Sequence, residues 1–340
     1  MEFLRRHLGL ILRVAISATI LGWLAHKIEW AELGRRIQLA DPAWIVAAIV
    51  LVGITLVISA LRWQILLRVQ EIALRFLPIF QVSMIGQFFN SFLLGTTGGD
   101  VVKIVYITQL APHKKSAAGL SVLLDRVIGL IALILLTVGL SASRYRLLTS
   151  TAQSAQALWT FYLIAAGVAG VLLVAAFLPV LLRFANLKRL EKKLPFHERI
   201  ERISEAFVRN SRNPGANLEA LLLSFVAHLL NLFSQYAVAR ALHLDVSFVT
   251  VATATAIIYV LISIPISVAG LGVRESLFVL LLGLSGVSRE GAIAVSLIGF
   301  SISLVWSFVG GVIHLRYKNP PSPPKSQSSL SPTVADGAVP

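Results

Sequence analysis

The chain has 340 residues, of which 56% are hydrophobic and 14% are charged, and it carries a net charge of +14 and no cysteine. Soluble globular domains are usually ~45–50% apolar and ~25% charged, so this composition excludes an ordinary soluble protein and predicts a membrane protein with several spans. The lack of cysteine excludes disulfides, thiolate nucleophiles and cysteine-ligated metals, and we assign the excess basic residues to cytoplasmic loops rather than to nucleic-acid binding.

The N-terminal part of the chain predicts two spans separated by an interfacial helix. The first helix, about residues 7–28, follows two arginines as a signal peptide would, but many apolar segments come after it, so we interpret it as a retained span. Residues 29–39 are amphipathic and are expected to lie in the membrane interface. Asp41-Pro42 provides an N-cap and a first helical residue for the second span. Arg62-Trp63 is expected to end that span as an interfacial anchor.

Two later apolar segments are interrupted by glycines. The first runs from Pro78 to about Leu110 and breaks at residues 95–99, and the second runs from Phe248 to Gly283 and breaks at residues 263–275. Each resembles a helix that enters the membrane, breaks and restarts beside a carboxylate, which predicts a re-entrant hairpin. Further full spans are expected at residues 117–142, 159–182, 218–242 and 290–315, with a basic loop at residues 183–217.

The predicted fold is therefore all-α, with about six full transmembrane helices and two re-entrant hairpins. If both hairpins return to the side they came from, most lysines and arginines outside the membrane share one side with both termini, which the positive-inside rule places in the cytoplasm. The span–hairpin–span units at about residues 43–141 and 218–316 would then be inverted repeats, an architecture common in transporters. We expect one membrane domain, residues 1–318, and a disordered cytoplasmic tail, residues 319–340.

The candidate substrate-binding residues lie at the two breaks and in the span between them. An ionisable residue in a span costs at least ~2.5–3.5 kcal/mol, so these side chains are expected to be paired or to line a wet cavity. Helix N-termini, threonine hydroxyls and an arginine would hold an anionic group such as a lipid phosphate, while the carboxylates would take cations or protons or weaken the grip on the phosphate. The primary candidates are Thr96, Thr97, Gly98, Gly99, Asp100, Lys103, Arg126, Gly270, Gly272, Arg274 and Glu275, and the secondary ones are Asn90, Asp125, His228, Asn231 and Gln235.

Structural roles remain open for the same residues. Asp100 with Lys103, and Arg126 with Glu275, would form salt bridges that hold the two repeats together, and Lys103 would alternatively extend to the interface. The polar face of the 218–242 span would form interhelical hydrogen bonds. The glycines at the breaks would serve positive φ or close backbone approach. No catalytic motif or paired-histidine metal motif is present, so we expect no catalytic residue, metal or cofactor.

Four motifs together resemble the lysylphosphatidylglycerol synthase/flippase transmembrane family. They are Arg62-Trp63, Phe89 to Lys103, Leu123 to Leu130 and Pro265 to Glu275, and the similarity covers about residues 5–317. The family typically has arginine at the position of Lys103, which keeps the charge but loses bidentate geometry. The proline that usually precedes the first glycine turn is replaced near Leu94-Gly95.

The resemblance implies a lipid-translocating domain in which Asp100, Arg126 and Glu275 match the charged flippase positions. Because no soluble aminoacyl transferase follows Lys318, we do not expect the synthase activity. The expected function is a flippase for a phospholipid or polyprenyl-phosphate-type lipid in a bacterial inner membrane.

Two alternatives and several partners complete the expectations. One alternative is a non-transporting scaffold whose basic loop, residues 183–212, recruits a separate cytoplasmic enzyme or binds anionic lipid. The other is an intramembrane enzyme acting on lipid phosphates with Asp100 and Glu275 as acid and base. The expected partners are the membrane lipid itself, anionic lipid at the basic loop, and a second copy of the chain or a cytoplasmic enzyme, but not nucleic acid.

Overall fold

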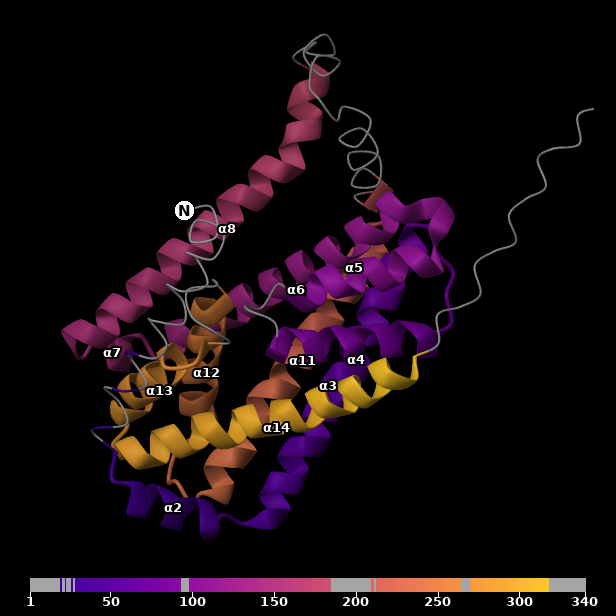
Figure 1. The fold of residues 1–340 in the computed structure, drawn as a ribbon. Helices are drawn as coiled ribbons and strands as arrows, with labels where there is room; N and C mark the ends of the chain where they lie inside the picture. Colours follow the sequence, from indigo (N-terminus) through magenta and orange to yellow (C-terminus); the bar gives the residue numbers. More distant parts are fainter. Residues whose placement is uncertain are drawn as a thin grey trace, which may run out of the picture.

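The computed structural model describes residues 28–92, 98–184, 209–210, 212–263 and 270–317, together with positions 19, 22 and 26 (Figure 1). These residues form helices and no strand, so the all-α prediction is confirmed for them. The expected first span, the tail from residue 319, and most of the basic loop lie outside the described residues. In chain order the helices are α2 (Trp30–Gln38), α3 (Pro42–Val69), α4 (Phe76–Phe92), α5 (Gly98–Leu110), the short 3-10 helix η1 (Pro112–Lys114), α6 (Lys115–Ser143), α7 (Tyr145–Leu148), α8 (Ala152–Phe184), α11 (Pro214–Ala241), α12 (Phe248–Ser263), α13 (Val273–Gly283) and α14 (Arg289–Arg316).

Four helical segments among the described residues are long and apolar enough to cross a membrane. They are α3, the continuous segment η1–α6, α11 and α14. These segments contain four of the predicted spans, and α8, with 33 residues, covers a fifth. Several membrane-spanning helices are thus established by length and composition, whereas the count of six spans and the re-entrant character of the hairpins stay predictions.

The start of α3 and the orientation of α2 can be explained from nearby residues in the sequence. Asp41 caps α3, its carboxylate accepting a hydrogen bond of 2.8 Å from the Ala43 backbone N–H, and Pro42 is the first helical residue. On α2, Leu33 is buried while Trp30 is 61% exposed, which fits the predicted amphipathic helix. Glu32 on the same helix has a lowered pKa, chiefly because it accepts a hydrogen bond from Arg35.

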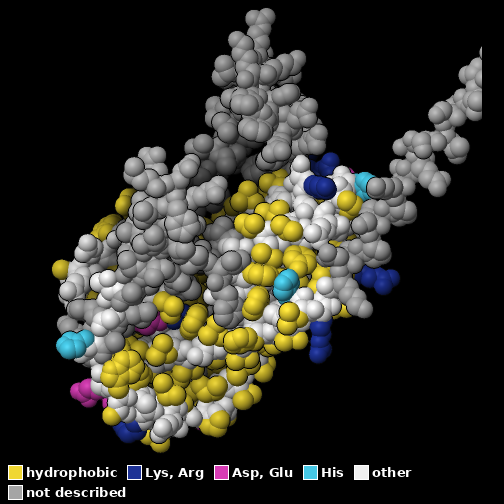
Figure 2. Space-filling model, in the orientation of Figure 1, with side chains coloured by type: hydrophobic (Ala, Val, Ile, Leu, Met, Phe, Trp, Pro, Cys, Tyr) yellow, Lys and Arg dark blue, Asp and Glu magenta, His cyan; other side chains and the backbone are white. Residues whose placement is uncertain are grey.

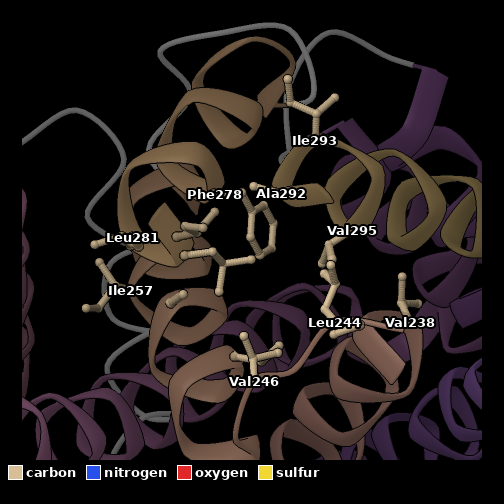
Figure 3. Close-up of a cluster of buried hydrophobic side chains, with 14 of the residues drawn as sticks. Val238, Leu244, Val246, Ile257, Phe278, Leu281, Ala292, Ile293 and Val295 are labelled. Atoms are coloured by element: carbon tan, nitrogen blue, oxygen red, sulfur yellow. The ribbon is translucent and has the colours of Figure 1, made fainter. Parts of the chain in front are cut away.

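Apolar side chains fill most of the core and are also exposed on several helices. The largest cluster of the core joins α11, α12, α13 and α14 around side chains such as Val238, Ile257, Phe278 and Val295 (Figure 3). Figure 2 shows hydrophobic side chains over most of the described part of one face, with lysine and arginine at its margins. Exposed large side chains recur along α3 and α14, for example Val50 and Phe308. Contiguous apolar surface of this kind suits contact with lipid rather than water.

The two interrupted segments form helical pairs that dock on opposite units of the chain. Helix α4 packs against α5 and also against α14, while α12 packs against α13 and also against α6. Helices α3 and α11 lie along each other and connect the two sets, and α14 crosses the front of the view in Figure 1. The first interrupted segment therefore contacts α14, near the C-terminal end of the described chain, and the second contacts α6, in the N-terminal half.

Glycines at the two breaks serve different backbone needs. A Cβ on Gly99 would overlap the Gly86 carbonyl oxygen, so α4 and α5 touch through their backbones there. The Gly99 N–H also donates a 2.8 Å hydrogen bond to the Asn90 side-chain oxygen. Gly270 and Gly272 have φ of 75° and 83°, which side-chain-bearing residues rarely adopt. Close approach thus explains the glycine of the first break, and positive φ explains those of the second.

Basic residues from distant segments meet at the turn between α3 and α4. Lys114 Nζ donates to the carboxylate of Glu71 at 2.8 Å and to its carbonyl oxygen at 3.0 Å. Arg209 Nη1 lies 3.2 Å from the same carboxylate. These two cations, led by the hydrogen bond from Lys114, lower the pKa of Glu71. The turn after α3, the turn after α5 and the end of the basic loop therefore lie at one end of the bundle.

The contact between α14 and α4 predicts a strong effect of one added methyl group. A Cβ on Gly310 would overlap the Met84 carbonyl oxygen, so Gly310→Ala should lower the free energy of unfolding by roughly 1–3 kcal/mol through overpacking. The measurement is unfolding of the purified protein in detergent. The matched control is Gly139→Ala on α6, where nothing lies within 4 Å of the new Cβ. Equal stability of both variants would contradict the close packing of α4 and α14.

Candidate functional site

A cavity of about 330 Å³ lies between α3, α5, α6, α11 and α12. Nine of its eleven lining residues have polar side chains, even though most of the helices that form it are apolar. The lining residues are Thr55, Ser59, Arg62, Asp100, Asp125, Arg126, Gly129, Ala227, His228, Asn231 and Tyr259. Tertiary packing therefore brings together five of the residues singled out from the sequence: Asp100, Asp125, Arg126, His228 and Asn231.

One wall of the cavity is a buried ion pair between α3 and α6. Arg62 Nε lies 2.7 Å from Asp125 Oδ1, and each side chain is 10% exposed. Arg62 Nη1 also donates to the Ser224 hydroxyl on α11 at 3.0 Å. The pair thus ties three long helices together.

The predicted interfacial anchor at Arg62-Trp63 is wrong. Helix α3 continues to Val69, so both residues lie inside the helix and face its neighbours. Trp63 is fully buried, and its indole N–H donates to the Ser121 hydroxyl at 3.1 Å. The sequence placed the end of the helix nearly two turns too early because an arginine and a tryptophan are typical of an interface, whereas here both are buried against neighbouring helices.

A second ion pair, between α5 and α6, is more accessible. Arg126 Nη1 donates to Asp100 Oδ2, and the two side chains are 37% and 16% exposed. Asp100 lies in the first turn of α5, directly after the break, where a carboxylate is also favoured by the helix dipole.

The alternative salt bridges suggested by the sequence, Asp100 with Lys103 and Arg126 with Glu275, are wrong. Lys103 instead extends over the Trp63 ring, with Nζ 5.3 Å from the ring centre. Its aliphatic stem passes so close to Gly86 that a Cβ there would meet the stem at 2.7 Å. One helical turn separates Asp100 from Lys103, but packing against α4 and α3 directs the lysine away from the carboxylate.

The two ion pairs differ in what their loss would cost. Removing one partner of a buried pair leaves an uncompensated charge and typically costs ~3–5 kcal/mol. A partly exposed pair is typically worth only ~0–1 kcal/mol, because water screens both charges. Arg62–Asp125 therefore acts as a structural tie, whereas Arg126–Asp100 presents a guanidinium that another anion could approach.

The opposite wall of the cavity offers neutral hydrogen-bonding groups. His228 Nε2 donates to the Gly129 carbonyl oxygen at 2.9 Å, which places the proton on Nε2 because a carbonyl only accepts. Gln235, one turn beyond Asn231, donates from its amide nitrogen to the Tyr259 hydroxyl at 3.0 Å. The expected interhelical hydrogen bonds from α11 are therefore present for His228 and Gln235. The side-chain oxygens of Asn231 and Gln235 are buried without a hydrogen-bond partner among the described residues.

The charged residues after the second break form a closed cluster away from this cavity. Glu275 is 1% exposed; it accepts hydrogen bonds from the Gly272 backbone N–H at 2.6 Å and from Arg274 Nη2 at 2.5 Å. The Ser296 hydroxyl on α14 donates to the same carboxylate at 2.9 Å. The Arg274 guanidinium lies 4.5 Å from the centre of the Phe300 ring. Neither Arg274 nor Glu275 belongs to the cavity lining, so only the first break contributes a charge to it.

The remaining predicted residues have simple placements. Thr96 and Thr97 lie outside the described residues, and Gly98 begins α5. Asn90 supports the α4–α5 contact through its bond to Gly99. In the part of the chain that the structure describes, no group of three or more histidine or acidic side chains could hold a metal ion.

Six lining residues were not predicted as site residues, and four of them have polar side chains: Thr55, Ser59, Arg62 and Tyr259. The first three have the spacing i, i+4, i+7, which puts them on one face of α3. This polar stripe within an apolar span could have identified these three residues from the sequence. Tyr259 had no comparable signal, because only the packing of α12 against α11 brings it to the cavity.

Comparisons with known proteins agree with the membrane fold. A family model described as "Lysylphosphatidylglycerol synthase TM region" matches residues 10–311. A UPF0104 membrane protein of Pyrococcus horikoshii is 29% identical over 136 residues, and this match spans 38% of each chain. A UPF0104 membrane protein of Methanothermobacter thermautotrophicus is 22% identical over 327 residues, or 92% of this chain and 96% of the relative. No solved structure matches significantly.

The difference between the two ion pairs predicts unequal losses of stability. Asp125→Asn should lower the free energy of unfolding by ~3–5 kcal/mol, because Arg62 would be left buried without its counter-ion. Asp100→Asn should cost only ~0–1 kcal/mol. Denaturant unfolding in detergent measures both, with Glu32→Gln on α2 as a carboxylate-to-amide control outside the cavity. A loss for Asp100→Asn as large as for Asp125→Asn would show that the second pair is also a structural tie.

Proposed function

This chain belongs to the lysylphosphatidylglycerol synthase transmembrane family, and from that premise we propose that it moves an anionic lipid between the two leaflets of a membrane. The lipid headgroup occupies the cavity between α3, α5, α6, α11 and α12, while the acyl chains stay in the bilayer. Passage is passive or coupled to an ion.

The observation that carries this proposal is the accessible guanidinium of Arg126 in the wall of a polar cavity. Three of the five helices that line the cavity, α3, α6 and α11, are of membrane-spanning length. Arginine in such a place is costly and commonly marks a substrate or ion pathway. Its fork of N–H donors matches a phosphate group. A volume of about 330 Å³ is at the lower end for small-molecule pockets, which suits a headgroup without its acyl chains.

We further propose that both interrupted segments are re-entrant hairpins in two inverted units, residues 43–141 and 218–316. Helices α5 and α13 have 13 and 11 residues, too few to cross a hydrocarbon core that needs about 20. The reciprocal docking of α4 on α14 and of α12 on α6 supports the correspondence between the units.

The orientation follows from the basic end of the bundle. Lys114 and Arg209 meet beside Glu71 at the turn after α3. By the positive-inside rule this end faces the cytoplasm, and under the proposed topology both termini lie on the same side. We place the protein in the plasma membrane on the same grounds.

The scaffold and enzyme alternatives make different predictions for a purified protein. A scaffold would not translocate lipid by itself, and an intramembrane enzyme would change the mass of the lipid. Binding of anionic lipid or of a cytoplasmic enzyme by the basic loop, and pairing of two copies of the chain, remain further proposals. No observation on the described residues favours one of them.

Reconstituted liposomes test the proposed function. The protein should speed the exchange between leaflets of a fluorescent phosphatidylglycerol, measured by quenching from the outside. Arg126→Gln should slow that exchange about tenfold or more, because a charge-assisted hydrogen bond to the headgroup is lost. The matched control is Arg35→Gln, an exposed arginine on α2 that is also paired with a carboxylate.

Two results would overturn the proposal. One is exchange no faster than in protein-free liposomes. The other is equal exchange with Arg126→Gln and wild type. Mass spectrometry of the recovered lipid, run in parallel, would reveal the enzymatic alternative as a changed headgroup.

A further inference from the structure

We propose that the Asp100–Arg126 ion pair is a latch that an anionic lipid headgroup opens. The headgroup phosphate takes Arg126 from Asp100, and the released carboxylate lets the N-terminal end of α5 move away from α6. The identity of the opening ligand rests on the function proposed above, whereas the mechanical role of the pair does not.

The position of Asp100 makes it an internal substitute for the ligand. Its carboxylate accepts a hydrogen bond from Nη1 of Arg126 at the wall of the cavity. A phosphate diester, like a carboxylate, spreads one negative charge over two acceptor oxygens, and both groups pair with arginine, often in a bidentate way. A headgroup that binds Nη1 competes with Asp100 for that donor, so binding there requires Asp100 to give up the contact. The exchange balances, since one anion replaces another on Arg126 and Asp100 becomes hydrated or takes up a cation.

The other ion pair in the cavity does not suit this role. Arg62 and Asp125 are each 10% exposed, and Arg62 is also bound to Ser224 on a third helix. Arg126 is 37% exposed. Arg126 is therefore more accessible than Arg62, both to water and to a headgroup that enters the cavity.

The packing of α5 shows which contact would open. On its α4 side the backbones touch at Gly86 and Gly99, and Asn90 is bound to Gly99. On its α6 side the glycine contact is loose, because a Cβ on Gly119 would lie 3.7 Å from Ile104 Cγ2, an ordinary van der Waals distance. The ion pair therefore joins α5 to α6 near the break, whereas the buried side chains of Ile107, Ala118 and Val122 pack the two helices together nearer to η1.

The connection between α5 and α6 gives the movement a hinge. The short helix η1 joins the two helices at the end of α5 opposite to Asp100. With 13 residues, α5 is about 20 Å long, so a small rotation at η1 displaces Asp100 the most. A closed latch also keeps both charges paired when the cavity holds no lipid, which lowers the cost of keeping them in the membrane.

A pair of introduced cysteines reports the latch directly. The natural chain has no cysteine, so Ile104→Cys with Gly119→Cys supplies the two thiols that can join α5 to α6, at a separation compatible with a disulfide. The rate of oxidative cross-linking is measured in nanodiscs of phosphatidylcholine, with and without added phosphatidylglycerol. We expect phosphatidylglycerol to slow cross-linking by up to about fivefold. Adding Asp100→Asn should slow it by a similar factor in phosphatidylcholine alone, and adding Arg35→Gln should leave it unchanged.

A binding measurement without cysteines covers the case in which the double-cysteine protein does not fold. Asp100→Asn should bind fluorescent phosphatidylglycerol up to about fivefold more tightly than wild type, since the internal competitor is gone. Arg126→Gln should bind it more weakly. Unchanged or weaker binding by Asp100→Asn would overturn the latch.

The outcomes separate this inference from the proposed function. Cross-linking that responds neither to phosphatidylglycerol nor to Asp100→Asn overturns the latch. A response to Asp100→Asn but not to phosphatidylglycerol overturns the claim that an anionic headgroup opens it. If wild-type protein exchanges lipid in liposomes while cross-linking stays constant, only the latch fails. If cross-linking responds as expected but no exchange occurs, only the proposed function fails.

Discussion

A charge inside an apolar helix bundle must be neutralised, and the rest of this structure depends on how that requirement is met. The pair Arg62–Asp125 lies between α3 and α6 and extends through Ser224 to α11. Separating these helices would expose an unpaired charge to hydrocarbon, at a cost of several kcal/mol. The pair therefore holds together three of the helices that line the cavity, α3, α6 and α11. It also explains why a space lined by polar groups persists in a chain of this composition.

The same requirement is met differently at the two glycine breaks. Glu275 closes on its own neighbours, Arg274, Ser296 and the Gly272 N–H, and is almost completely buried. Asp100 reaches across to Arg126 at a cavity wall that solvent can enter. Glu275 thus stabilises the start of α13, whereas Asp100 is paired with an arginine that also lines the cavity. The two carboxylates have different roles because Asp100 lines the cavity and Glu275 does not.

Family membership and site geometry contribute separate parts of the functional argument. The match over residues 10–311 establishes the kind of membrane domain, but the names of the UPF0104 relatives state no substrate. The chemistry of the cavity supports the proposed ligand, an anionic group small enough for about 330 Å³. Breaking a buried ion pair costs much more free energy than breaking an exposed one. Because Arg126 is more exposed than Arg62, a ligand could displace the partner of Arg126 more easily.

Sequence alone determined the membrane character, the start of α3 and the approximate positions of the breaks. Hydropathy, the Asp41-Pro42 cap and the positive φ at Gly270 and Gly272 are properties of a segment and its immediate neighbours, so a linear pattern carries them. The family motifs are carried in the same way. The number of spans and the inverted arrangement of the two units were also inferred from linear patterns, and both stay predictions.

Only the tertiary structure decided which charges pair and which face the cavity. Lys103 lies one turn from Asp100 and was the obvious partner by sequence, yet it extends over Trp63 while Arg126 takes the carboxylate. Arg62 looked like an anchor and proved to be buried. The physical reason is that partner choice depends on how each helix is rotated against its neighbours. That rotation is set by contacts between residues far apart in the chain, such as Gly310 against Met84, and a linear pattern does not record it.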